Sequence, residues 1–141
     1  MTYFPDGSPY SYVAEAQKDV AFNIGWLDKN VAYQTGDVPA EFVGRLRDIC
    51  RSGVNRTRGM HQCNLCPPDQ ATTWVEPTTI RGSAADYVVG GAEIRALSRD
   101  GTVYASPDMI IHYVESHGYR PPEEFIEAVL ASDINRQAPS R

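Results

Sequence analysis

The first half of the chain opens with a strand pattern. Residues 19–28 place apolar side chains at every second position, namely Val20, Phe22, Ile24 and Trp26. A period of two is typical of a strand with one buried face. We therefore predict a strand here, followed by a loop over residues 29–38.

Residues 39–51 have the spacing of an amphipathic helix. Pro39 suits the first helical position, where a missing N–H leaves no hydrogen bond unmade. The apolar side chains recur at helical intervals and form one stripe: Phe42, Val43, Leu46, Ile49 and Cys50. We interpret Cys50 as a small buried core thiol rather than as a metal ligand. Gly53 is expected to end the helix.

The second half of the chain predicts a hairpin. Tyr87–Leu97 and Gly101–Ala105 have strand character, and the Asp100-Gly101 pair between them is a tight-turn signal. Thr72–Val75 predicts one further short strand.

Two helices are predicted after the hairpin. Ser106 can cap the first one, Pro107 suits its first helical position, and Gly118 is a favourable residue at its end. The second helix covers residues 123–131 and turns its apolar side chains inward: Phe125, Ile126, Val129 and Leu130.

These elements predict an α+β fold, with a small antiparallel β-sheet and about three helices. The chain has 141 residues, of which 42% are hydrophobic and 22% charged, as in ordinary globular domains. We expect residues 1–131 to form one domain and residues 132–141 to be a frayed tail. No apolar run approaches the roughly 20 residues of a membrane helix, and the first residues lack signal-peptide features, so we expect a cytoplasmic protein.

The charge distribution favours a protein partner over nucleic acid or a membrane. A net charge of −5 opposes binding to phosphate-rich surfaces, which need a positive field. One local exception, the arginine patch, consists of Arg45, Arg47, Arg51, Arg56 and Arg58. The patch is either a solvated helix face with its adjoining loop or a binding site for phosphate or nucleic acid.

Two cysteines and two histidines have the spacing of a zinc site. Cys63 and Cys66 form a Cys-x-x-Cys pair, the usual half of a tetrahedral site, and we call this turn a zinc knuckle. His112 and His117 supply the other half at an allowed separation. Residues five apart on a helix diverge by about 140°, so the helix end must adapt. His61 is the alternative ligand.

Three other interpretations of these residues stay open. A redox dithiol is disfavoured because Pro67 and Pro68 follow the pair, whereas redox motifs of this type open a helix. A metal site with an open position would support a hydrolase, with Glu115 or Glu93 as candidate bases. His117 also lies among apolar residues, so a hydrogen-bonded core histidine is the third interpretation.

The N-terminal residues 3–12 combine turn formers with four aromatic rings. This composition suits an irregular segment that packs across the domain surface. If these rings were exposed instead, they would form a contact patch for a partner.

Four phrases of the chain resemble a group of small uncharacterised bacterial proteins. They are YFPDGSPY at 3–10, NIGWLD at 23–28, RGMHQCNLC at 58–66 and HYVESHGYRPP at 112–122. The resemblance extends to about residue 130 and implies one compact unit, without implying an activity.

Together the patterns predict a binding module rather than an enzyme. We expect a structural zinc and an immunity-type or regulatory role through contact with a protein partner. The alternatives are a zinc-dependent hydrolase with an open metal position, and phosphate or nucleic-acid binding through the arginine patch.

Overall fold

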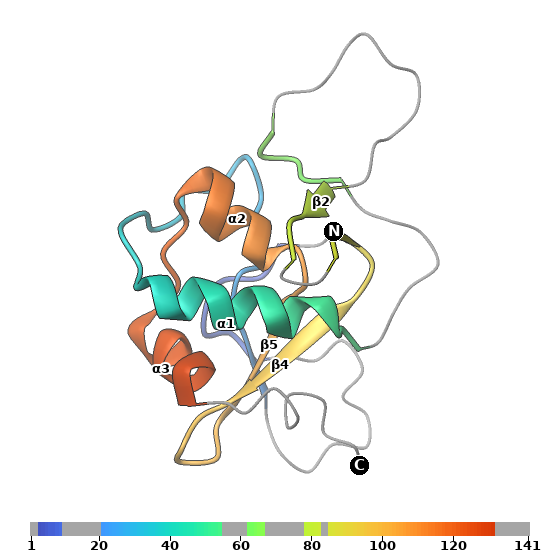
Figure 1. The fold of residues 1–141 in the computed structure, drawn as a ribbon. Helices are drawn as coiled ribbons and strands as arrows, with labels where there is room; N and C mark the ends of the chain where they lie inside the picture. Colours follow the sequence, from blue (N-terminus) through green and yellow to red (C-terminus); the bar gives the residue numbers. More distant parts are fainter. Residues whose placement is uncertain (1–2, 10–20, 55–61, 67–77, 83–84, 132–141) are drawn as a thin grey trace, which may run out of the picture.

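A computed structural model describes residues 3–9, 21–54, 62–66, 78–82 and 85–131, and its fold is α+β (Figure 1). The helices are α1 (Ala40–Arg51), α2 (Ile110–His117) and α3 (Glu123–Ala131). The strands are β1 (Ala21–Asn23), β2 (Thr78–Ile80), β3 (Tyr87–Val89), β4 (Glu93–Leu97) and β5 (Val103–Pro107). Within these ranges, no helix is long and apolar enough to cross a membrane.

The strands form two small sheets. The larger has the order β1-β5-β4, and β2 pairs with β3 in the smaller one. The pair β4–β5 is antiparallel, as the predicted hairpin requires, and β2–β3 is antiparallel as well. Strand β1 runs parallel to β5, with Ala21 opposite Val103. The larger sheet is therefore mixed, with one parallel and one antiparallel pair. The parallel pair requires the chain to cross back over the domain between β1 and β5.

The helices pack on the sheet and on one another. Figure 1 shows α1 across the middle of the molecule, with α2 on one side of it and α3 on the other. The core between them is aromatic and aliphatic: Phe42 of α1 meets Phe125 of α3 edge to face, with ring centroids 6.2 Å apart. Phe42, Leu46, Ile49 and Cys50 are buried, which confirms these positions of the predicted stripe and the core position of Cys50, whereas Val43 is partly buried at its edge.

The predicted strand over residues 19–28 is shorter in the structure. Its first residues lie outside the described ranges, and β1 ends at Asn23. Gly25 then takes a φ of +83°, which turns the chain out of the extended conformation. Ile24 and Trp26 are buried as predicted, but Phe22 is only half-buried while its neighbours Ala21 and Asn23 are buried, so the alternation is wrong within β1 itself.

The predicted strand over Tyr87–Leu97 is two strands. Gly90, with a φ of +122°, separates β3 from β4. Its backbone N–H donates to the buried carboxylate of Asp108 at 2.9 Å instead of to a neighbouring strand. The hairpin between β4 and β5 is present, with a turn closed by Gly101 N–H on the Ser98 carbonyl at 3.1 Å.

The helix predicted to start after Ser106 begins at Ile110. Ser106 and Pro107 instead complete β5, where they pair with Ile94 and Glu93. Ladder pairing thus overrides the capping preference of Ser106. The predicted end is correct, because Gly118 follows His117 in the left-handed conformation with a φ of +66°. Helix α3 has the predicted bounds.

Two predictions concern the smaller sheet and the tail. The strand predicted at Thr72–Val75 and the frayed tail at 132–141 both lie outside the described residues. Strand β2, over Thr78–Ile80, was not predicted, although Thr-Thr-Ile is β-branched and has high strand propensity.

Residues 3–9, here called the N-terminal strap, lie along residues 22–26. Phe4 packs edge to face on Trp26, with ring centroids 5.5 Å apart. Gly7 N–H donates to the Asn23 carbonyl at 2.7 Å. Phe4 therefore packs on the domain, as the first of the two interpretations predicted, whereas Tyr3 is 37% exposed, and the other two rings, Tyr10 and Tyr12, lie outside the described residues.

The contact between Gly25 and α2 generates a stability prediction. A Cβ at Gly25 would lie 2.6 Å from Ile110 Cδ1, in a backbone region that L residues disfavour. We expect Gly25→Ala to cost about 2–4 kcal/mol of unfolding free energy, measured by urea denaturation, because strain and overpacking add. Gly7→Ala is the matched control: its φ is +87° but nothing lies within 4 Å. A similar loss in both variants would contradict the packing argument.

Candidate metal centre

The two cysteines lie in a tight turn over residues 62–66. Backbone N–H groups of Leu65 and Cys66 hydrogen-bond the Cys63 sulfur. Such donors stabilise a thiolate, the form in which cysteine binds metal. The Asn64 side-chain amide donates to Asp28 Oδ1 at 2.9 Å, which ties the turn to the loop after β1.

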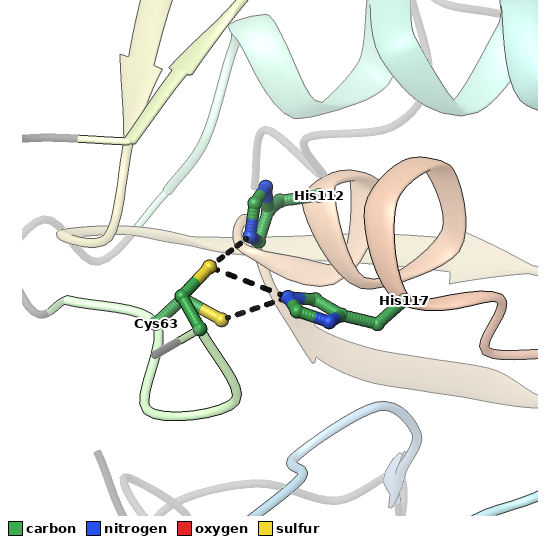
Figure 2. A group of neighbouring side chains, drawn as sticks. Cys63, His112 and His117 are labelled. Atoms are coloured by element: carbon green, nitrogen blue, oxygen red, sulfur yellow. Dashed lines mark hydrogen bonds between the residues drawn. The ribbon is translucent and has the colours of Figure 1, made fainter. Parts of the chain in front are cut away.

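The two histidines come from opposite ends of α2. His112 lies in its first turn and His117 is its last residue. The backbone after His117 is held by the segment around residues 33–36: Tyr33 Oη donates to the His117 carbonyl at 3.3 Å, and Gly36 N–H donates to the Gly118 carbonyl at 3.2 Å. Figure 2 shows both imidazole rings pointing at the cysteine turn.

The four donor atoms meet in the space between α2 and the turn. Cys63 Sγ lies 3.5 Å from His117 Nε2. Cys66 Sγ lies 3.3 Å from His112 Nε2 and 3.4 Å from His117 Nε2. A tetrahedral zinc with ordinary bond lengths separates sulfur and nitrogen ligands by roughly 3.5 Å. The donor set and its spacing therefore fit a tetrahedral metal ion.

The difficulty of the five-residue spacing is overcome by side-chain reach. Both histidines approach through Nε2, the ring nitrogen farther from the backbone. The rings meet nearly at right angles, with centroids 5.0 Å apart and planes at 77°. Although the two Cα atoms lie on different sides of the helix, the ring nitrogens converge. All four ligand atoms lie within 4.8 Å of one another.

The centre is half-buried, and burial disfavours the charged forms of Cys63 and His112. Cys63 is 6% exposed, whereas the other three residues are intermediate. Burial raises the pKa of the Cys63 thiol to about 11, against the effect of the backbone hydrogen bonds. Burial also lowers the pKa of His112, and the neighbouring His117 adds to this effect. A bound divalent cation would reverse the balance at the thiols, because it stabilises the thiolate directly.

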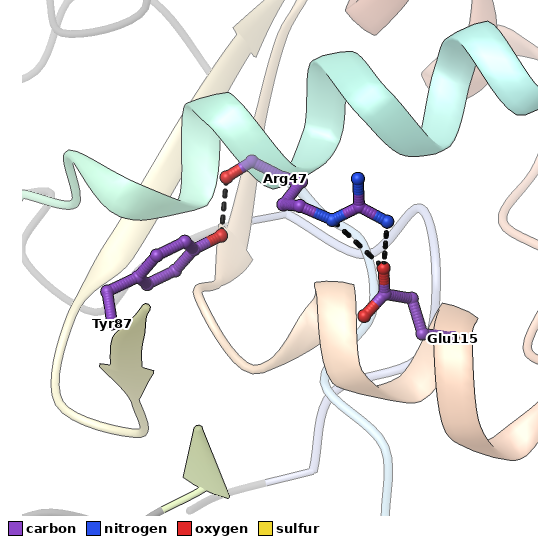
Figure 3. A network of polar contacts seen from close by, with 3 residues as sticks. All are labelled: Arg47, Tyr87 and Glu115. Carbon is purple, nitrogen blue, oxygen red and sulfur yellow. Dashed lines mark hydrogen bonds and ion pairs between the residues drawn. The ribbon is translucent and has the colours of Figure 1, made fainter. Parts of the chain in front are cut away.

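A polar network fixes α2 against α1 beside the centre (Figure 3). Glu115, between the two histidines in sequence, accepts a hydrogen bond from Arg47 Nε at 3.1 Å and forms an ion pair with its guanidinium. Tyr87 Oη donates to the backbone carbonyl of Arg47 and so links β3 to the same turn of α1. The Glu115 carboxylate is therefore engaged with α1.

The other predicted site residues that the structure describes are not part of the metal cluster. Glu93, the second candidate base, forms an ion pair with Arg95 at 3.0 Å. Arg45 pairs with Glu41 at 3.6 Å, and Arg51 is exposed at the end of α1. Three predicted residues lie outside the described ranges: His61, Arg56 and Arg58.

Sequence reasoning missed the residues that position the ligands. Asp28, which anchors the cysteine turn, and Tyr33, which holds the end of α2, lie far from the ligands in sequence. Asp28 lies in a phrase singled out by resemblance, but no spacing rule connects it with residue 64. These contacts depend on tertiary structure alone.

Comparison with known proteins gives one match. The sequence model of a family described as "Domain of unknown function (DUF7919)" matches residues 2–130. The match includes all four cluster residues and the elements that position them. No curated protein and no solved structure matches the chain.

The positions of the three cysteines generate a second prediction. Cys50→Ala should keep metal stoichiometry unchanged and cost about 1 kcal/mol of stability, because it removes only a small buried group. Cys66→Ala should lose metal, because it removes a cluster sulfur. Metal content of the purified variants measures both outcomes, and loss of metal from Cys50→Ala would contradict the assignment.

Proposed function

The chain belongs to the family DUF7919, and we propose that it is a zinc-binding domain in which the metal has a structural role and the surface binds a protein partner. The observation that carries the proposal is the convergence of Cys63, Cys66, His112 and His117. Figure 2 displays the geometry on which it depends.

The donor set favours zinc over other divalent ions. Two sulfur and two nitrogen donors suit a borderline-soft ion without a strong geometric preference. The sulfur–nitrogen distances of 3.3–3.5 Å match a tetrahedral shell. Calcium and magnesium prefer oxygen ligands and higher coordination numbers.

A structural role is supported by the completeness of the cluster. Four protein donors fill a tetrahedral shell and leave no position for a water or substrate. The candidate base Glu115 is turned to Arg47. The metal would instead fasten the turn over residues 62–66 to α2, two segments separated by more than forty residues.

A basic protein segment is the proposed partner. An open cleft of about 600 Å³ lies between the β4–β5 turn and α3. Its lining carries three carboxylates and one cation and is therefore acidic on balance: Asp100, Glu124, Glu127 and Arg99. The net charge of −5 favours the same class of partner. The arginine patch supports an acidic ligand less well, because Arg45 and Arg47 already pair with carboxylates.

Metal analysis with X-ray absorption tests the zinc site. We expect one zinc per chain with two sulfur neighbours at about 2.3 Å and two nitrogen neighbours at about 2.0 Å. Cys63→Ser and His117→Ala should bind zinc far more weakly. Saturating zinc at 100 times its Kd should stabilise the wild-type protein by about 2.7 kcal/mol in urea unfolding.

His61→Ala is the control for the alternative ligand. It should keep the wild-type zinc shell, since the cluster is complete without His61. An oxygen atom in the wild-type shell would favour the hydrolase instead. A protein without any bound metal would overturn the proposal.

Charge reversal on α3 tests the proposed partner surface. A partner is first copurified with the zinc-loaded chain, and the complex is then reconstituted from purified components. This partner should bind the Glu124→Lys/Glu127→Lys variant at least about tenfold more weakly than it binds the wild-type protein. Arg45→Ala/Arg51→Ala serves as the matched control and should bind normally. The opposite pattern would favour the arginine patch as the binding surface.

A further inference from the structure

The N-terminal strap is joined through one carboxylate to two segments that flank α2. Asp6 Oδ1 accepts the backbone N–H of Gly25 at 2.9 Å, and its Oδ2 accepts the hydroxyl of Tyr119 at 2.7 Å. Asp6 itself is exposed, whereas Tyr119 is fully buried. The contact thus connects a surface segment to the interior of the domain.

These two contacts bracket the helix that carries both histidines. Gly25 packs against Ile110, the first residue of α2, so closely that it has no room for a Cβ. Tyr119 is the second residue after His117, and its N–H caps the helix on the Tyr113 carbonyl at 3.2 Å. A single side chain therefore bears on both ends of α2.

We propose that Asp6 and Tyr119 are positioning residues for the metal centre, so that docking of the strap and binding of the metal reinforce each other. The inference rests on the proposed zinc site. Neither residue touches the cluster; both act through the placement of α2 and, above all, of His117 at its end.

His117 has to satisfy a demanding geometry at the end of its helix. The Nε2 atom of His117 has to lie close to both cysteine sulfurs. His117 is also the last residue of α2, and helix ends fray. Each contact that fixes the next residues reduces the number of conformations in which the ring points away. Part of the free energy of the Asp6–Tyr119 hydrogen bond, which involves a charged acceptor, should then appear as metal affinity.

Linkage makes the effect reciprocal. If the docked strap strengthens metal binding by some factor, bound metal must strengthen strap docking by the same factor. The strap has polar backbone contacts to β1 and the residues after it, so it does not depend on Asp6 alone: Phe4 N–H donates to the Trp26 carbonyl at 3.2 Å. Loss of the carboxylate contact should therefore loosen the strap without unfolding the domain.

Zinc affinity measured by competition with a chromophoric chelator tests the proposal. Tyr119→Phe removes one hydroxyl and keeps the buried ring, and Asp6→Ala removes both hydrogen bonds at an exposed position. We expect the Kd for zinc to rise about three- to tenfold in each variant. The double variant should be no weaker than Asp6→Ala, because the two residues share one bond.

Tyr3→Phe is the matched control, since it makes the same substitution on the strap at a ring that is 37% exposed. Its Kd should stay within about twofold of the wild-type value. Amide exchange gives the reciprocal readout: zinc should slow exchange at Phe4 and Gly7 in the wild-type protein, and this dependence should shrink in Tyr119→Phe.

The outcomes separate this proposal from the one on which it rests. A wild-type protein that binds no zinc would overturn both. A wild-type protein that binds zinc, with Tyr119→Phe and Asp6→Ala equal to Tyr3→Phe in Kd, would overturn the positioning role alone. In that case a lower unfolding temperature would show that the contact only stabilises the fold.

Discussion

The rest of the structure depends on one constraint. Two thiols and two imidazoles must occupy the same small space. The sulfur and nitrogen atoms approach within 3.3–3.5 Å, in surroundings that raise the pKa of Cys63 and lower that of His112. Without a cation, burial favours the neutral forms of Cys63 and His112. With a bound cation, the same four side chains would form its coordination shell, and the cation would join the two segments that carry them.

The elements around α2 are arranged to keep that space open to all four ligands. Its start is held by the close approach of Gly25 to Ile110, and its middle by the ion pair between Glu115 and Arg47. Hydrogen bonds from Tyr33 and Gly36 hold the chain where the helix ends. Because these contacts come from α1, from the loop before it and from the residues after β1, much of the described domain contributes to the position of two rings.

The sequence predicted the residues of the cluster and the helices better than the strands. Cys63, Cys66, His112 and His117 could be named because sulfur and imidazole ligands have recognisable spacing, and the apolar stripes of α1 and α3 repeat over several turns. Ser106 misled because its capping propensity is local, whereas its pairing with Ile94 depends on a strand elsewhere. Asp28 and Asp6 carry no local signal, since an aspartate's partner is chosen only when distant segments meet.

The parallel pairing of β1 with β5 has a consequence for how the domain assembles. The β4–β5 hairpin closes over a short turn, but Ala21 must find Val103 across most of the chain. Contacts at such separation form slowly, so β5 is expected to keep an unpaired edge for most of the folding time. That edge could template pairing with another chain before β1 arrives.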